Sequence, residues 1–137
     1  MSALPPLVTR PLEIMDDPSL DSEQHHQALH ALARIHIISR TASQVAQSIA
    51  TLIRSSSLSD DAPLRVLDIA CGGGDLTAAV ATILGKKLPQ QVECIGLDIS
   101  ERAIDWARSK HTVSTGNARV SFQSCDVLRD KLPTCTV

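Results

Sequence analysis

Residues 66–77 read V-L-D-I-A-C-G-G-G-D-L-T, and this stretch decides the fold class. A short apolar run that ends in Asp68 is typical of a buried β-strand, and the small residues after it allow a tight turn. From Leu76 onward the apolar residues recur at helical spacing, so a helix follows the turn. We predict a first strand over residues 65–69, then a glycine turn, then a helix that stops at Gly85.

The same alternation of strand and helix recurs twice along the chain. A second apolar run over residues 92–97 is followed by Asp98, and a third over residues 120–125 is followed by Asp126. Ser100 is suited to cap the helix between them. The regular spacing is that of a strand plus a crossover helix, which places all three strand ends at one edge of a parallel sheet. Ligands bind at this edge in open α/β sheets.

The predicted fold is therefore an α/β, Rossmann-like parallel sheet, truncated after about three strands and preceded by a helical segment. Residues 1–20, with four prolines, form an extended lead-in; residues 21–62 form a helical segment and linker; residues 63–137 form the partial Rossmann-like domain. Asp21 is suited to cap the first helix, and weak helix formers near Ser39 make two helices with a bend as plausible as one. Three strands in the order 3-2-1 would leave the first strand as an unprotected edge.

Composition excludes several classes of protein. The chain has 137 residues, 43% of them apolar, and a net charge of -2, which fits one domain without a nucleic-acid partner. No apolar run approaches the length of a membrane span, and the cysteine spacing fits neither a metal site nor a disulfide framework. We expect reduced thiols, a cytoplasmic location and no metal, with His25, His26 and His30 solvated on a helix and Trp106 in packing or at the surface.

The glycine turn predicts a cofactor site, because Gly72 and Gly74 allow close approach of a ligand to the backbone at a helix N-terminus. A dinucleotide site requires G-x-G-x-x-G, but Thr77 stands at the third glycine position. The carboxylates of Asp68 and Asp75 would repel a pyrophosphate and favour a cationic sulfonium. The residues favour S-adenosylmethionine, with a dinucleotide-binding oxidoreductase fragment as the alternative.

Three motifs together resemble one known family. Residues 66–77 resemble the first motif of class I S-adenosylmethionine-dependent methyltransferases, closest to the ubiquinone/menaquinone-biosynthesis type, although that family usually has glycine where this chain has Ala70. Residues 96–100, G-L-D-I-S, and residues 124–128, S-C-D-V-L, resemble the second and third motifs. The resemblance covers the N-terminal, cofactor-binding part of the family.

The resemblance implies roles for individual residues. Asp98 would accept hydrogen bonds from both ribose hydroxyls, and Ile99 would pack on the adenine ring. Asp126 would accept a hydrogen bond from the adenine amino group, with the Val127 backbone beside the ring. The cofactor-binding residues expected from the turn and the resemblance are Asp68, Ala70, Cys71, Gly72, Gly74, Asp98, Ile99, Asp126 and Val127.

The resemblance also implies an activity, which is direct transfer of a methyl group to an acceptor. We expect a small-molecule acceptor; the catalytic residues are not readable from the sequence, because such a displacement needs alignment more than acid–base groups. In the family the acceptor side follows the third strand, where residues 129–137 would at most begin a fourth. A fragment that binds cofactor without turnover, and a non-catalytic module that uses the open edge for self-association, are further readings.

Overall fold

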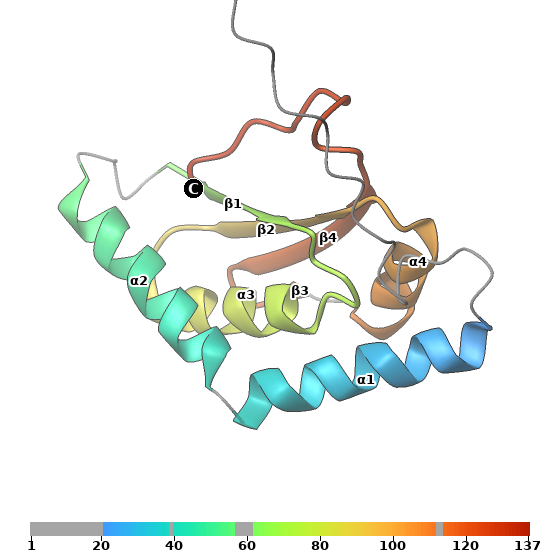
Figure 1. Cartoon of the computed structure of the whole chain (residues 1–137). Helices are drawn as coiled ribbons and strands as arrows, with labels where there is room; N and C mark the ends of the chain where they lie inside the picture. The colour runs from blue at the N-terminus through green and yellow to red at the C-terminus, as the bar shows by residue number, and fades with distance from the viewer. Residues whose placement is uncertain (1–20, 39, 57–61, 112–113) are drawn as a thin grey trace, which may run out of the picture.

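The computed structural model describes residues 21–38, 40–56, 62–111 and 114–137. The lead-in expected over residues 1–20, and the middle of the expected linker, lie outside this range. Figure 1 shows helices packed below a small sheet, with the C-terminal segment passing above it. This is the layered α/β arrangement that the sequence predicts, and none of the described helices is long and apolar enough to cross a membrane.

Two helices precede the sheet, which is one of the two alternatives that the sequence left open. Helix α1 spans Ser22–Ile38 and helix α2 spans Thr41–Ser55, and between them Arg40 adopts a left-handed conformation with φ of 54°. Helix α2 is amphipathic and packs against α3, burying its alanine and isoleucine side chains. Its buried residues are Ala46, Ile49, Ala50 and Ile53.

The sheet contains three parallel strands and one short antiparallel strand. Strands β1 (Leu64–Ile69), β2 (Val92–Asp98) and β4 (Ala118–Ser124) are parallel, and β2 lies in the middle. This arrangement confirms the predicted order of the three main strands. The two-residue strand β3 (Ser114–Thr115) pairs antiparallel with the start of β4. It was not predicted, because two residues carry no hydrophobic period.

Two crossover helices join the parallel strands. Helix α4 (Glu101–Lys110) begins as predicted, with Ser100 Oγ accepting a hydrogen bond of 3.3 Å from the Ala103 N–H. Helix α3 spans Asp75–Lys87, so the prediction that Gly85 ends this helix is wrong. A Cβ at Gly85 would lie 2.6 Å from the Cβ of Ala118. This glycine is therefore explained by the close approach of the helix to β4, and not by a helix end.

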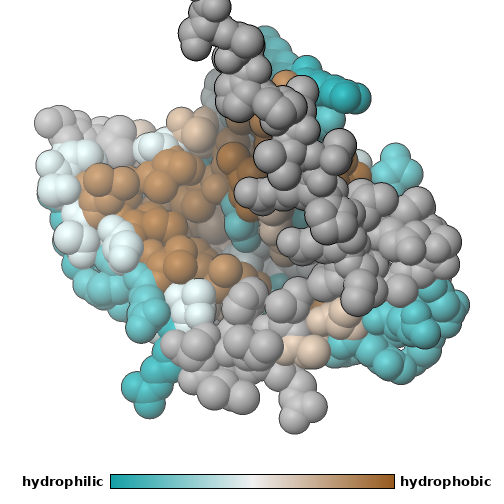
Figure 2. Space-filling model, viewed as in Figure 1, coloured by the Kyte–Doolittle hydropathy of each residue, from teal (hydrophilic) through white to brown (hydrophobic). Residues whose placement is uncertain are grey.

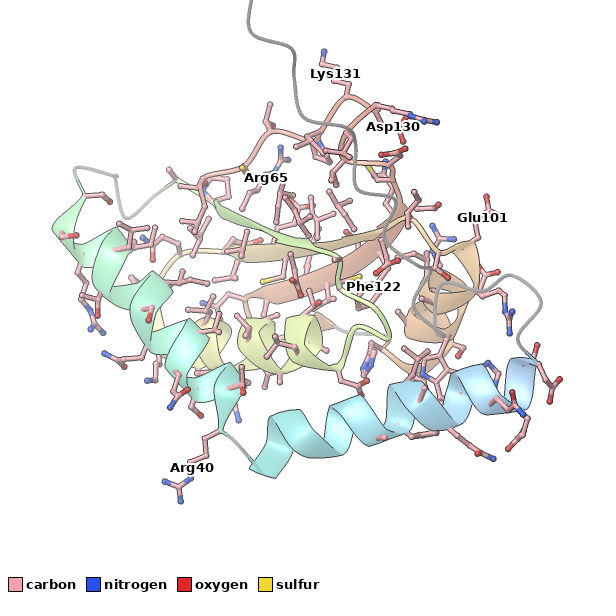
Figure 3. All side chains as sticks on the ribbon, in the orientation of Figure 1. Arg40, Arg65, Glu101, Phe122, Asp130 and Lys131 are labelled. Carbon is pink, nitrogen blue, oxygen red and sulfur yellow. The ribbon has the colours of Figure 1, made fainter. Side chains whose placement is uncertain are left out.

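The side chains on one face of the sheet form the core. Aliphatic residues of β1 and β2 pack against α2 and α3, while Phe122 of β4 packs against Ile104 and Ala107 of α4. Val120 contacts both clusters, so all these helices cover the same face. Phe122 points from β4 into this layer (Figure 3). Aromatic residues are scarce in the chain, and aliphatic packing supplies most of the hydrophobic stabilisation.

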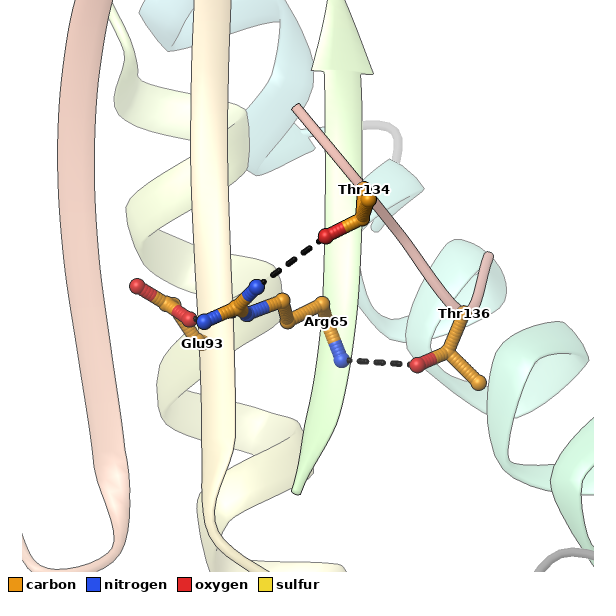
Figure 4. Close-up of polar contacts among 4 residues, drawn as sticks. All are labelled: Arg65, Glu93, Thr134 and Thr136. Carbon is orange, nitrogen blue, oxygen red and sulfur yellow. Dashed lines mark hydrogen bonds and ion pairs between the residues drawn. The ribbon is translucent and has the colours of Figure 1, made fainter. Parts of the chain in front are cut away.

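The C-terminal residues cover part of the outer edge of β1, which corrects the expectation of an unprotected first strand. The Val137 N–H donates to the Arg65 carbonyl at 3.0 Å, and the Leu67 N–H donates to the Val137 carbonyl at 2.9 Å. This alternation is the hydrogen-bond pattern of a parallel pair. Figure 4 shows the accompanying side-chain contacts: Arg65 bonds Glu93 at 2.7 Å and Thr134 at 3.2 Å. The edge is thus paired as far as Leu67.

Candidate functional site

The glycine turn connects β1 to α3 at the carboxyl edge of the sheet. The Gly74 N–H donates to the Cys71 carbonyl at 3.0 Å, which closes the turn, and the Cys71 N–H donates to the Leu97 carbonyl at 3.0 Å. Gly72 and Gly74 have φ of 54° and 78°, a region that side chains disfavour. The turn is therefore fastened to β2 and leaves the first N–H groups of α3 free of intrahelical partners.

Ala70 shares the left-handed conformation of the two glycines, with φ of 62°. Its methyl group is exposed, so the cost lies in the backbone and not in a clash. The left-handed region costs an alanine roughly 1–2 kcal/mol. This backbone angle gives a physical reason why glycine suits the position, and it shows that alanine is tolerated there.

Replacing Ala70 with glycine is expected to raise the free energy of unfolding by up to about 1 kcal/mol, because relief of the left-handed strain exceeds the added freedom of the unfolded chain. Urea titration measures this change. As the control, Ala31→Gly on the exposed side of α1 should lower the free energy of unfolding by about 1 kcal/mol. Equal losses in the two variants would contradict the assignment of strain to Ala70.

Asp98 ends β2 and is tied to the glycine turn. One carboxylate oxygen accepts a hydrogen bond of 2.8 Å from the Gly72 N–H, and the other accepts one of 2.9 Å from the Ser100 N–H. The side chain is half-buried. Hydrogen bonds to a carboxylate are stronger than neutral ones, so these two contacts fix both the orientation of Asp98 and the position of the Gly72 peptide.

Asp68 points instead toward α3. Its carboxylate accepts a hydrogen bond of 2.5 Å from the hydroxyl of Thr77, which is 2% exposed. The two residues lie on the wall of a cavity of about 130 Å³, which is otherwise mostly aliphatic. Figure 2 shows a hydrophobic surface beside α2 on this side of the molecule. The cavity is lined by Val45, Ile49, Val66, Leu67, Asp68, Leu76, Thr77, Val80, Cys94 and Val137.

The Cys71 thiol is affected by the negative charges of both Asp68 and Asp98. Burial, then the negative charges of Asp68 and Asp98, raise the pKa of its thiol to about 12. A thiol with so high a pKa stays protonated at neutral pH, and the thiolate is the reactive form. The Cys71 thiol is therefore unreactive at neutral pH.

Alkylation should reveal this protonated state. With its pKa raised from 9.0 to about 12, Cys71 carries far less thiolate at pH 8 than an ordinary thiol. Iodoacetamide should modify it at least about tenfold more slowly, even though a more basic thiolate is the better nucleophile. Exposed Cys135 serves as the internal reference. Peptide mapping of the time course measures both rates, and modification of Cys71 as fast as Cys135 would contradict the assignment.

The remaining predicted site residues lie at the ends of β2 and β4. Ile99 is 68% exposed, directly after Asp98. Asp126 lies two residues beyond β4, where its carboxylate accepts a hydrogen bond of 3.1 Å from the Leu128 N–H and contacts Arg129 at 3.5 Å. The Cys125 N–H donates to the Asp98 carbonyl at 2.9 Å, which joins the two strand ends. Val127 is half-buried beside them.

The predicted residues thus fall into two groups. One group follows the ends of neighbouring strands and consists of the glycine turn, Asp98, Ile99 and Asp126. The other is Asp68, whose carboxylate is bonded to Thr77. The order of the strands also reverses at β1, since β2 and β4 lie on one side of it and the C-terminal residues pair on the other. A crevice at such a reversal is where open α/β sheets bind ligands.

Sequence reasoning missed the residues that pack on the turn from outside. Leu29 of α1 is 3% exposed, and its side chain lies 3.6 Å from where a Cβ of Gly73 would stand. Trp106 of α4 lies at 3.3 Å from the same point. Leu29 is buried on α1, but no local sequence pattern says which surface this helix covers. Among the described residues no cluster of His, Cys, Asp or Glu is suited to hold a metal ion.

Comparisons with known proteins give the family. The family model described as a methyltransferase domain matches residues 60–134. Protein-lysine N-methyltransferase efm4 of Schizosaccharomyces pombe (strain 972 / ATCC 24843) is 33% identical over 73 residues, which are 53% of this chain and 31% of that protein. The structure of the plantazolicin methyltransferase BpumL in complex with SAH matches with a TM-score of 0.52 and 21% identity, over 77% of this chain and 36% of the other.

The chain therefore spans about a third of the length of these relatives. The structural match supports the predicted Rossmann-like architecture, and the family match falls on the strands and turn that carry the three motifs. The predicted family and fold class are both confirmed. On this evidence the chain belongs to the methyltransferase domain family.

Proposed function

We propose that this chain binds S-adenosylmethionine across the carboxyl ends of β1, β2 and β4, as the cofactor-binding part of a methyltransferase. Asp98 carries the proposal. Its two oxygens each accept one backbone hydrogen bond, from Gly72 and Ser100, and a carboxylate oxygen can accept more than one. The two oxygens of Asp98 are fixed side by side, so they suit two donors that also lie side by side, such as the two hydroxyls of a ribose.

The neighbouring residues support the rest of the cofactor. Exposed Ile99 offers an apolar surface for a planar base, and Asp126 with the Val127 backbone stands at the next strand end. The glycine turn lets the amino-acid end of the cofactor approach the N-terminus of α3. Negative charge at Asp75, in the first turn of α3, disfavours a pyrophosphate there. Thr77 also stands where a dinucleotide site requires glycine, so the dinucleotide alternative has less support.

When bound, S-adenosylmethionine supplies an electrophilic methyl group on a positively charged sulfur. The protein binds and orients the cofactor: Asp98 holds the ribose, the glycine turn holds the amino-acid end, and α1 covers the turn through Leu29. Methyl transfer of this kind depends on alignment and on exclusion of water more than on a general base. We assign no catalytic acid or base among the described residues.

The acceptor is proposed to be a small molecule. A lysine side chain is the second candidate, because the Schizosaccharomyces pombe relative is a protein-lysine N-methyltransferase. Incubating the protein with methyl-labelled cofactor and a cell extract, then separating proteins from small molecules, distinguishes the two. We expect label in the small-molecule fraction, and label confined to protein would replace this proposal with the second candidate.

A thermal-shift comparison tests cofactor binding. S-adenosylhomocysteine at a hundred times its dissociation constant should stabilise the folded chain by about 2.7 kcal/mol, which corresponds to a rise of several degrees in the melting temperature. NAD at the same concentration should give no shift. Stabilisation by NAD without stabilisation by S-adenosylhomocysteine would favour the dinucleotide alternative instead.

A further inference from the structure

Two histidines of α1 surround the tryptophan of α4. The imidazole of His26 stacks on the Trp106 indole with ring centroids 4.1 Å apart and planes at 28°, and His30 meets the indole edge-on at 5.1 Å and 85°. The Lys110 ammonium lies 4.7 Å from the centroid of the indole. Trp106 and His26 are half-buried. The expectation that these histidines are simply solvated is therefore wrong for His26, and Trp106 has specific partners on another helix.

The Trp106 indole also packs against the glycine turn. Trp106 Cδ1 lies 3.3 Å from the position of a Cβ on Gly73, and Leu29 of α1 approaches that position to 3.6 Å. Gly73 is buried although it has no side chain of its own to pack. The packing that holds this peptide is therefore provided by its neighbours. One ring thus joins α1, α4 and the turn.

We infer that Trp106 is a positioning residue for cofactor binding, which holds the Gly72–Gly74 peptides in place while His26 and His30 hold the indole against α1. This inference rests on the proposed function. Two hydrogen bonds define the turn: Gly72 N–H to Asp98 at 2.8 Å and Gly74 N–H to Cys71 at 3.0 Å. Removal of the indole would let the turn move away from Asp98 and would loosen the bond that closes it, and small misplacements of binding groups cost large factors in function.

Trp106→Ala should therefore weaken S-adenosylhomocysteine binding by about ten- to a hundredfold, measured by calorimetry at a temperature where the variant is folded. Trp106→Phe keeps a ring against Gly73 and His26, so it should restore affinity to within about threefold of the original chain. Leu84→Ala is the matched control: Leu84 is fully buried in the last turns of α3, away from the glycine turn. It should lower stability without changing affinity.

Amide hydrogen exchange of the ligand-free chain provides a readout that does not depend on the cofactor. Trp106→Ala should speed exchange at the Gly72 and Gly74 amides by at least about tenfold relative to Leu84→Ala. Unchanged exchange at both amides, or equal acceleration in Leu84→Ala, would overturn the inference. So would unchanged affinity in Trp106→Ala. If the original chain fails to bind S-adenosylhomocysteine, the proposed function falls, while the exchange rates still decide whether Trp106 holds the turn.

Discussion

Gly74→Ala is expected to lower the free energy of unfolding by about 2–5 kcal/mol. A Cβ at this position would lie 2.4 Å and 2.6 Å from two ring carbons of Phe122, and 3.0 Å from the Cβ of Ala107. The left-handed φ of 78° adds roughly 1–2 kcal/mol of backbone strain, and overpacking of a filled core costs about 1–3 kcal/mol. Urea titration measures the sum.

Gly116→Ala is the matched control for this substitution. Gly116 has a similar φ of 62°, but an added Cβ would meet no atom within 4 Å. Its loss should therefore be limited to the backbone strain of roughly 1–2 kcal/mol. The excess loss in Gly74→Ala measures the contact with Phe122. Equal losses in the two variants would show that the turn can shift away from Phe122, contrary to our account of the site.

Asp98→Ala is expected to weaken S-adenosylhomocysteine binding by at least about a hundredfold. The substitution removes the acceptor of the proposed ribose hydrogen bonds, and hydrogen bonds to a charged group contribute about 1.5–3 kcal/mol each. It also leaves the Gly72 N–H without the carboxylate that now accepts it at 2.8 Å, so the turn loses its tie to β2. Calorimetric titration of the folded variant measures the change in affinity.

The control for Asp98 is another carboxylate on the same crossover. Asp105 lies on α4, where its side chain is 77% exposed and contacts Arg108 at 3.6 Å. Surface ion pairs of this kind contribute little, and Asp105→Ala should leave the affinity unchanged. Binding to Asp98→Ala within threefold of the original chain would remove Asp98 from the site, and an equal loss in both variants would indicate a general effect of charge.

The main strands and crossover helices were predictable because their signals are local. Each strand is a short apolar run that ends in or near an aspartate, and the apolar residues of α3 recur at helical spacing. The helix end predicted at Gly85 was wrong, because glycine not only ends helices but also permits close packing of a helix against a strand. Residues 129–137 were expected at most to begin a fourth strand, but the pairing of Val137 with β1 was not predicted. A hydrogen bond between segments about seventy residues apart leaves no local pattern.

The candidate site was likewise predictable only in part. The acidic and glycine residues were found from their types and spacing, since a carboxylate at a strand end and a small-residue turn have chemical meaning in the sequence alone. Their partners were not found. These contacts depend on how separate elements pack together. They are the bond of Asp98 to Gly72, the bond of Asp68 to Thr77 and the packing of Trp106 on Gly73.

A crystal structure of the chain with S-adenosylhomocysteine tests the central claim most directly. We predict ribose hydroxyls within hydrogen-bond distance of both Asp98 oxygens, and the adenine ring lying on Ile99 beside Val127. Density for the ligand anywhere else, with the Asp98 carboxylate still bonded only to Gly72 and Ser100, would contradict the account.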